Sequence, residues 1–191
     1  MIRRVAIPPT SINTWIELFP FLENHDWKYT FTLPNLITKE TYLQSFQYKI
    51  ITRTLNCNYS LFKWGIKTSP VCVYCCHNDT ITHHLFECEK VQDFWRDVQS
   101  WIYDKLGVKF SLTVCEIIFG ISGLDDFTRA LNYIILFGKV YINKQRTSDT
   151  NLDLKEFISK LQDKVKVFFT CNQINQCKDD VSPLFKQLTR S

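Results

Sequence analysis

Residues 69–95 read SPVCVYCCHNDTITHHLFECEKVQDFW, and this stretch decides what kind of fold the chain adopts. It holds Cys72, Cys75, His83 and Cys88 in the spacing C-x2-C-x7-H-x4-C. The short first arm lets two thiolates grip one ion, and the second arm folds back to complete a tetrahedron of Zn²⁺ ligands. Three sulfurs and one imidazole leave no coordination position for water or substrate. The spacing therefore predicts a structural zinc site rather than a catalytic one.

Spacing alone leaves two ligand positions open. Cys76 is an alternative to Cys75, and His84 is an alternative to His83. His77 is a weaker candidate outside this set. The competing interpretation of the whole stretch is a loop whose thiols are buried and bind no metal.

Composition favours helices around this loop. The chain has 191 residues, of which 45% are hydrophobic, and it contains only 5 Gly and 6 Pro. That is enough chain for one substantial core, and too few turn residues for a β-sandwich or propeller. We expect a mainly α protein, a small helical domain with a CCHC zinc-binding loop between helices and an irregular N-terminal segment.

Apolar periodicity places the helices on either side of the metal loop. The clearest amphipathic stripe lies at 89–107 and stops at Gly107, while Thr38 and Asp125 are candidate helix N-caps. We read the basic end of the helix that Asp125 opens, Lys139 to Arg146, as a helix C-terminus. The predicted helices cover residues 39–55, 60–64, 111–119, 125–146 and a stretch from 152, besides 89–107.

The chain is expected to divide into four parts. Residues 1–37 contain four prolines among aromatic clusters and are predicted to be irregular, with at most short helices. A zinc-binding domain at 38–107 follows, then a C-terminal helical region at 108–172 and a flexible tail at 173–191.

The chain is expected to stay inside the cell. Its start, MIRRVAIPPTSINTW, has a basic pair but no apolar run of secretory length, and no segment is apolar over a membrane-spanning length. In a reducing compartment clustered cysteines more often hold metal than form disulfides, so we expect free thiols at the remaining positions, Cys57, Cys115, Cys171 and Cys177.

A series of motifs surrounds the metal loop. They are L-x-K-x-G-I at 61–66, S-P-x-C-x-x-C at 69–75, an acidic-Thr-Ile-x-His stretch at 79–83, F-x-C at 86–88 and F-W at 94–95. With these motifs, residues 40–165 resemble the zinc-binding domain that follows the reverse transcriptase domain in non-LTR (LINE-type) retrotransposon polyproteins. The resemblance favours His83 as the histidine ligand, although the doubled histidine keeps His84 open. It implies a C-terminal piece of a larger polyprotein whose endonuclease and polymerase lie elsewhere.

We expect no enzymatic activity in this chain. A polymerase needs carboxylates that hold two metal ions beside a primer. The acidic pair Asp125 and Asp126 sits at a predicted helix start, and Asp179 with Asp180 lies in a polar tail, so capping and solvation explain both. No Gly-rich phosphate loop and no nucleophile with an adjacent base stand out.

Nucleic-acid binding is the leading functional hypothesis, and RNA is the expected partner. Residues 36–71 contain five basic side chains and one carboxylate. Their local net charge of +4 equals that of the whole chain. Such an excess can track phosphates, and aromatic side chains can stack on unpaired bases. Trp64 has a second interpretation as a core anchor, and Lys63 and Lys67 as merely solvated charges. The candidate nucleic-acid-binding residues are Lys49, Arg53, Lys63, Trp64, Lys67 and Tyr74.

Two alternatives belong to other classes of protein. Fifteen Phe, eight Tyr and five Trp exceed the usual need of a small core, which favours a zinc-stabilised module that docks on the rest of the retrotransposon polyprotein or on a host protein. The other alternative is a non-functional retroelement remnant. No membrane partner is expected, and the resemblance implies a nuclear or cytoplasmic ribonucleoprotein.

Overall fold

The computed structural model describes the backbone of residues 9–175 and the side chains of residues 10–166. Within this part of the chain the structure is helical, and the only β-type pairing is an isolated bridge between Val71 and Asn78. The mainly α fold is therefore confirmed. The elements are α1 (Pro9–Leu18), the 3-10 helix η1 (Pro20–Asn24), α2 (Trp27–Ile37), α3 (Thr41–Ile51), α4 (Asn58–Lys63), the π-helical turn η2 (His83–Glu87), α5 (Glu89–Leu106), α6 (Val114–Phe119), α7 (Asp126–Thr147) and α8 (Leu154–Asn175).

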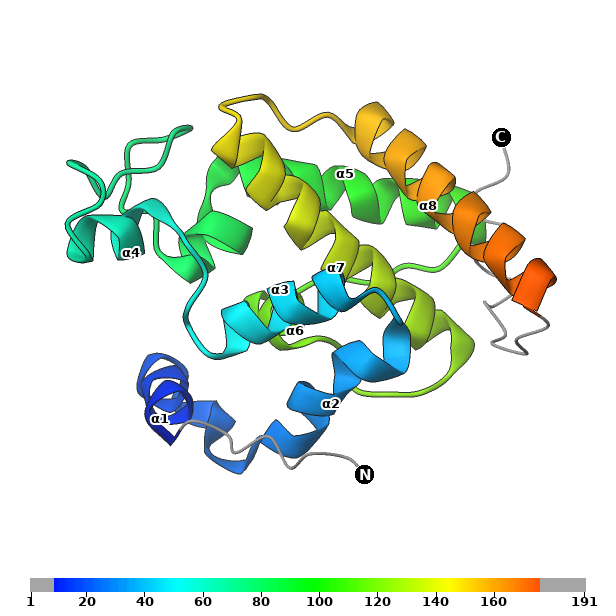
Figure 1. The fold of residues 1–191 in the computed structure, drawn as a ribbon, viewed down its shortest axis with the longest axis horizontal. Coiled ribbons are helices and arrows are strands. Elements are labelled where there is room, and N and C mark those ends of the chain that lie inside the picture. Colours follow the sequence, from blue (N-terminus) through cyan, green and yellow to red (C-terminus); the bar gives the residue numbers. More distant parts are fainter. Residues whose placement is uncertain (1–8, 176–191) are drawn as a thin grey trace.

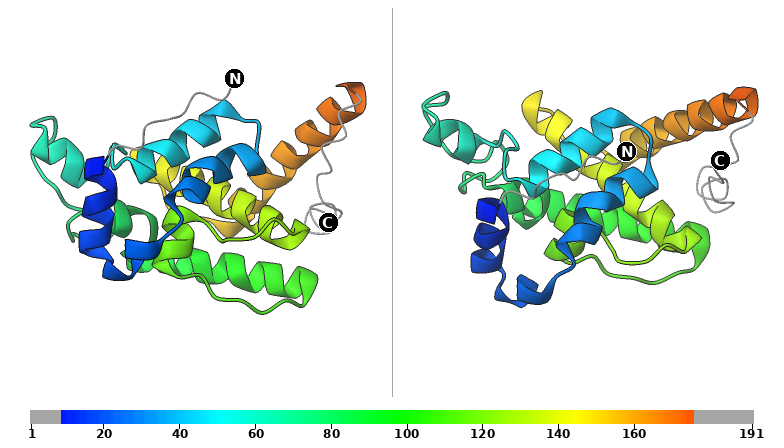
Figure 2. Two further views of the ribbon diagram at one scale, coloured as in Figure 1. Left: turned by 90° about the horizontal axis from the view of Figure 1, so that it is seen from below. Right: turned by 60° about the horizontal axis from the view of Figure 1, so that its bottom comes forward.

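Helix α7 is the centre of the fold. It runs through the middle of the molecule, with α2 and α3 on one side and α5 and α8 on the other (Figure 1). It contacts α2, α3, α6, α8 and η2. Helix α4 and the loop that follows it project from this body, as two further views also show (Figure 2). The metal loop therefore joins a protruding arm to the core.

Packing between α5 and α7 depends on one glycine. A Cβ atom added to Gly138 of α7 would lie 2.6 Å from the ring of Trp95 in α5. Trp95 is buried, and its indole Nε1 donates a hydrogen bond of 2.9 Å to the carbonyl oxygen of Leu85 in η2. Because Gly138 has no side chain, Trp95 can pack against α7 while it is hydrogen-bonded to η2, and so it links the metal-loop segment to the central helix.

Residues 9–37 are more regular than the predicted irregular segment with at most short helices. These residues form α1, η1 and α2, because their prolines lie where helices tolerate them. Pro9 is the first residue of α1 and Pro20 the first of η1, positions where the missing N–H has no intrahelical partner to lose. Pro34 lies one turn before the end of α2, and its carbonyl still accepts a hydrogen bond from the Thr38 amide. Residues 1–8 lie outside the described part.

The starts of α3 and α6 differ from those predicted. The helix expected at 39–55 is α3, and Thr38 is not its cap but the extended residue between α2 and α3. It ends early because Arg53 takes a left-handed φ of 60°. Helix α6 starts after Thr113 rather than at the predicted residue 111, because Thr113 and Glu116 form a capping box.

Other predicted ends are confirmed. Asp125 caps α7 by accepting a hydrogen bond from the Thr128 amide, and Gly107 ends α5 in the left-handed conformation with φ 67°. Helix α8 continues to Asn175, three residues into the predicted tail, whose remainder at 176–191 lies outside the described residues. In the described chain, no helix combines the length and apolar character needed to cross a bilayer.

Candidate metal centre and basic surface

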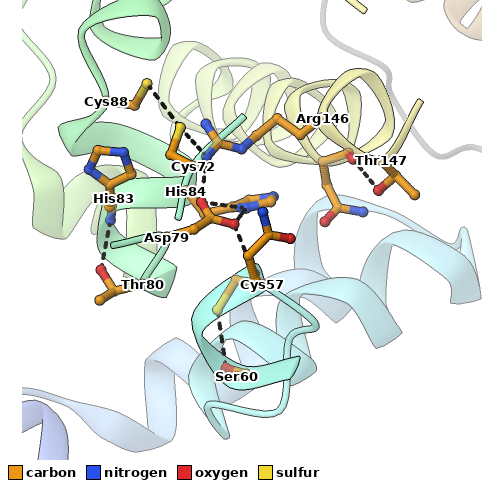
Figure 3. A network of polar contacts seen from close by, with 12 residues as sticks. Cys57, Ser60, Cys72, Asp79, Thr80, His83, His84, Cys88, Arg146 and Thr147 are labelled. Carbon is orange, nitrogen blue, oxygen red and sulfur yellow. Dashed lines mark hydrogen bonds and ion pairs between the residues drawn. The ribbon is translucent and has the colours of Figure 1, made fainter. Parts of the chain in front are cut away.

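The structure brings Cys72, Cys75, His83 and Cys88 into one cluster. Their ligand atoms all lie within 4.8 Å of one another. Cys72, His83 and Cys88 are buried and Cys75 is half-buried, and the three buried residues lie close together in Figure 3. The predicted set of four therefore converges on one point beneath the protruding arm.

A tight turn holds the first arm of the cluster. The amide of Cys72 donates to the carbonyl of His77 at 2.7 Å, and the amide of Asp79 donates to the carbonyl of Pro70 at 2.8 Å. Between them Cys76 adopts a φ of 61°, which turns its side chain outward. Because Cys76 is exposed and lies outside the cluster, the turn selects Cys75 as the second thiol.

The spacing of the ligand atoms suits a tetrahedral zinc ion. Thiolates about 2.3 Å from zinc, at tetrahedral angles, lie about 3.8 Å apart. The sulfur of Cys88 lies 3.8 Å from that of Cys72 and 3.8 Å from that of Cys75. The Nε2 atom of His83 lies 3.2 Å from the Cys75 sulfur, a slightly tighter corner. The donor set and its size therefore fit Zn²⁺.

The π-helical turn separates the two histidines. The amide of Cys88 donates to the carbonyl of His83 across five residues, so His83 and His84 project to different sides of η2. His83 faces the thiols, whereas His84 Nδ1 contacts the carboxylate of Asp79 at 3.1 Å. His77 is exposed, with its Nδ1 near the Cys75 carbonyl oxygen. The structure thus places His83, not His84, among the metal-ligand candidates.

A buried ion-pair network supports the cluster from behind. Arg146 of α7 pairs with the carboxylate of Asp79 and also donates to the Cys72 sulfur at 2.9 Å. Asp79 in turn accepts from the backbone amide of Asn58 at 2.9 Å, which ties the start of α4 to the site. Three thiolates and one Zn²⁺ carry a net charge of −1, and the guanidinium of Arg146 offsets it.

Sequence reasoning missed this role of Arg146. We read Lys139 to Arg146 as the basic end of a helix, and Arg146 does lie in the last turn of α7, but its side chain and that of Lys139 are buried. Arg146 is 74 positions from Cys72 in the chain, so no local spacing could reveal the contact. Asp79 was identified only as part of a motif, without its partner.

Electrostatics in the cluster favour metal-binding protonation states. Although burial opposes ionisation, hydrogen bonding from the Tyr74 amide and the nearby Arg146 guanidinium lower the pKa of the Cys72 thiol. Burial, followed by the charge of Arg146, lowers the pKa of His83, which keeps its imidazole neutral. Burial raises the pKa of Asp79, but hydrogen bonding and charge from His84 and then Arg146 outweigh it, so the carboxylate stays ionised.

The candidate nucleic-acid-binding residues fall into two groups. Lys49, Lys63, Trp64 and Lys67 are exposed, and Trp64 is 52% exposed at the end of α4. Lys63 lies 4.9 Å from the ring centroid of Tyr59, and Lys67 Nζ donates to Asn58 Oδ1 at 2.7 Å. We call this outer group the arm face: Lys63, Trp64 and Lys67 lie on the arm and Lys49 lies on α3, and together they leave three positive charges and one indole accessible.

Arg53 and Tyr74 form the second group, and both have internal contacts. The Arg53 guanidinium lies 4.5 Å from the ring centroid of Trp15. The hydroxyl of Tyr74 donates to the Thr150 carbonyl at 2.6 Å, and Arg146 lies 5.1 Å from its ring centroid. These contacts give the two side chains structural roles in the described fold.

Comparison with known proteins agrees with the metal centre. Residues 13–95 match the family described as zinc-binding in reverse transcriptase. The match begins within α1, includes the whole metal loop and ends at Trp95, so it covers less of the C-terminal side than the resemblance over 40–165. No curated protein and no solved structure was found to be similar to the chain. Residues 13–95, which contain the whole metal loop, are therefore similar to the reverse transcriptase zinc-binding family.

Proposed function

We propose that the chain is a non-catalytic zinc module from a LINE-type retrotransposon polyprotein and that it binds single-stranded RNA through the arm face. The zinc ion would be held by Cys72, Cys75, His83 and Cys88, a set that leaves no position for substrate. The role of the zinc ion is to stabilise the turn that connects the arm to the core. We place the protein in a nuclear or cytoplasmic ribonucleoprotein.

The observation that carries the proposal is the combination of charge and exposed indole on one arm. Lys63 and Trp64 are adjacent, and Lys67 follows three residues later; all three side chains are exposed. Basic side chains that track phosphates beside an aromatic ring that stacks on a base are the usual components of a single-strand binding surface. Each stacked base contributes about 1–3 kcal/mol.

A protein-docking role is the second candidate, because the same arm exposes apolar side chains. Phe62 and Ile66 are 44% and 68% exposed. Salt dependence separates the two functions, because phosphate contacts release counterions and apolar docking does not.

The deciding experiment measures binding of a fluorescent single-stranded RNA by zinc-loaded protein over a series of salt concentrations. We expect affinity to fall steeply with salt, and the double substitution Lys63→Gln/Lys67→Gln to reduce the slope by about 2 on a logarithmic plot. The matched control, Lys28→Gln/Lys109→Gln, removes two exposed lysines outside the arm face and should leave affinity within a small factor of wild type. Affinity that is independent of salt, or equal in the two double variants, would favour the docking role.

A further inference from the structure

The protruding arm depends on contacts at its base for its position. Its helix, α4, is six residues long, and none of these residues is buried. An isolated helix of this length is not stable in water, so contacts with the rest of the chain must hold it. The contacts of its first residue, Asn58, therefore help to decide where the arm lies.

Two hydrogen bonds of Asn58 join the arm to the metal loop. The backbone amide of Asn58 donates to the Asp79 carboxylate at 2.9 Å, and its side-chain Nδ2 donates to the Val71 carbonyl at 2.7 Å. Val71 directly precedes Cys72 in the chain. Asp79 pairs with Arg146 beside the Cys72 sulfur, as Figure 3 shows. Asn58 is thus fastened to the turn whose thiols would hold zinc.

The third hydrogen bond of Asn58 reaches the arm face. Lys67 Nζ donates to Asn58 Oδ1 at 2.7 Å, and the lysine side chain is otherwise exposed. An ammonium group has three N–H donors, so two of them stay available for a phosphate. The amide of Asn58 is neutral, so it orients Lys67 without cancelling its charge. One side chain therefore contacts both the backbone beside a metal-ligand candidate and a lysine of the arm face.

We propose that Asn58 is a positioning residue that couples zinc occupancy to RNA affinity. Zinc stabilises the turn at residues 70–79, the turn fixes Asn58, and Asn58 holds Lys67 in the position that meets a phosphate. When zinc leaves, the Val71 carbonyl is free to shift, and Lys67 loses its fixed position. The inference rests on the proposed function and adds its regulation, because metal loading brings the arm face to its RNA-binding form.

The test uses the reciprocity of this coupling. If zinc raises RNA affinity by some factor, bound RNA must raise zinc affinity by the same factor. Zinc affinity is measured by competition with a chromophoric chelator, with and without a saturating single-stranded RNA, in wild type, Asn58→Ala and Asn56→Ala. Asn56→Ala is the matched control, since it removes an exposed asparagine from the segment just before α4. A merely structural role of Asn58 would change both zinc affinities equally and leave their ratio unaltered.

We expect RNA to raise the zinc affinity of wild type and of Asn56→Ala by about fivefold or more, and that of Asn58→Ala by less than about twofold. If Asn58→Ala loses zinc or helical circular dichroism, Lys67→Met breaks the same link from its exposed end and should also lose the effect of RNA on zinc affinity.

Two outcomes would overturn the coupling while the proposed function stands. One is an equal effect of RNA on zinc affinity in wild type and in the variant that breaks the link. The other is a wild type that binds RNA with no change in zinc affinity. A zinc-loaded wild type that binds no RNA at any salt concentration would instead refute the proposed function, and the coupling with it.

Discussion

Replacing Lys139 by methionine should remove a pH dependence of stability that this one buried amine creates. Lys139 lies in the middle of α7, 2% exposed, and its Nζ donates to Gln47 Oε1. Burial lowers the pKa of Lys139 to about 7, from an ordinary value of 10.5. In that interval the unfolded chain holds a proton that the folded protein does not, so stability rises with pH.

The magnitude follows from the two pKa values. The free-energy penalty for folding with this lysine is about 4 kcal/mol at pH 7 and about 2 kcal/mol at pH 9. Wild type should therefore gain about 2 kcal/mol of unfolding free energy relative to Lys139→Met over that range. The substitution nearly keeps the length of the side chain. It leaves Gln47 Oε1 without its donor, but that cost in unfolding free energy is the same at every pH and does not affect the comparison between pH 7 and pH 9.

The assay is urea unfolding of zinc-loaded wild type and variant at pH 7, 8 and 9, and the quantity compared is the difference in unfolding free energy. Lys144→Met, on an exposed position of the same helix, is the control and should follow wild type at every pH. Parallel curves for wild type and Lys139→Met, or a difference of opposite sign, would refute the conclusion that the buried amine is neutral in the folded protein.

Three further substitutions test the metal centre and its support. Cys88→Ser should abolish stoichiometric zinc binding and cost on the order of 10 kcal/mol of metal-linked folding energy, measured by metal analysis and thermal unfolding. Asp79→Asn should cost about 3–5 kcal/mol at pH 7, because it removes the only carboxylate that pairs with the buried Arg146 charge in the described part of the chain. Since the pKa of Asp79 is lowered in the folded protein, its contribution is present above the ordinary value and is lost as pH falls through the folded value. Gly138→Ala should cost about 1–3 kcal/mol in urea unfolding, because its Cβ would meet the Trp95 ring.

A control for the zinc ligands and contrary outcomes for the other two substitutions complete the test. Cys76→Ser alters an exposed thiol outside the cluster and should keep full zinc content; loss of zinc in this variant would reassign the second ligand. An Asp79→Asn protein that is as stable as wild type at pH 7 would show that the ion pair contributes nothing. A stabilised Gly138→Ala protein would mean that helix propensity outweighs the clash with Trp95.

The described helices were largely predictable because their signals are local. The amphipathic stripe that ends at Gly107 and the cap at Asp125 each depend on residues within a few positions, and both appear where expected. Residues 9–37 are more helical than their local signals indicated. Proline counts alone suggest broken structure, whereas Pro9 and Pro20 occupy helix starts, which only the backbone path reveals.

The sequence by itself determined the position of the metal loop and the helical character of the chain, because ligand spacing over seventeen residues and apolar periodicity are both short-range properties. The tertiary structure decided between His83 and His84, since the π-helical turn directs one imidazole to the thiols and the other to Asp79. It also placed Arg146 against Cys72 and buried Lys139. These contacts join residues more than sixty positions apart, so they arise only when α7 packs against the metal loop and α3.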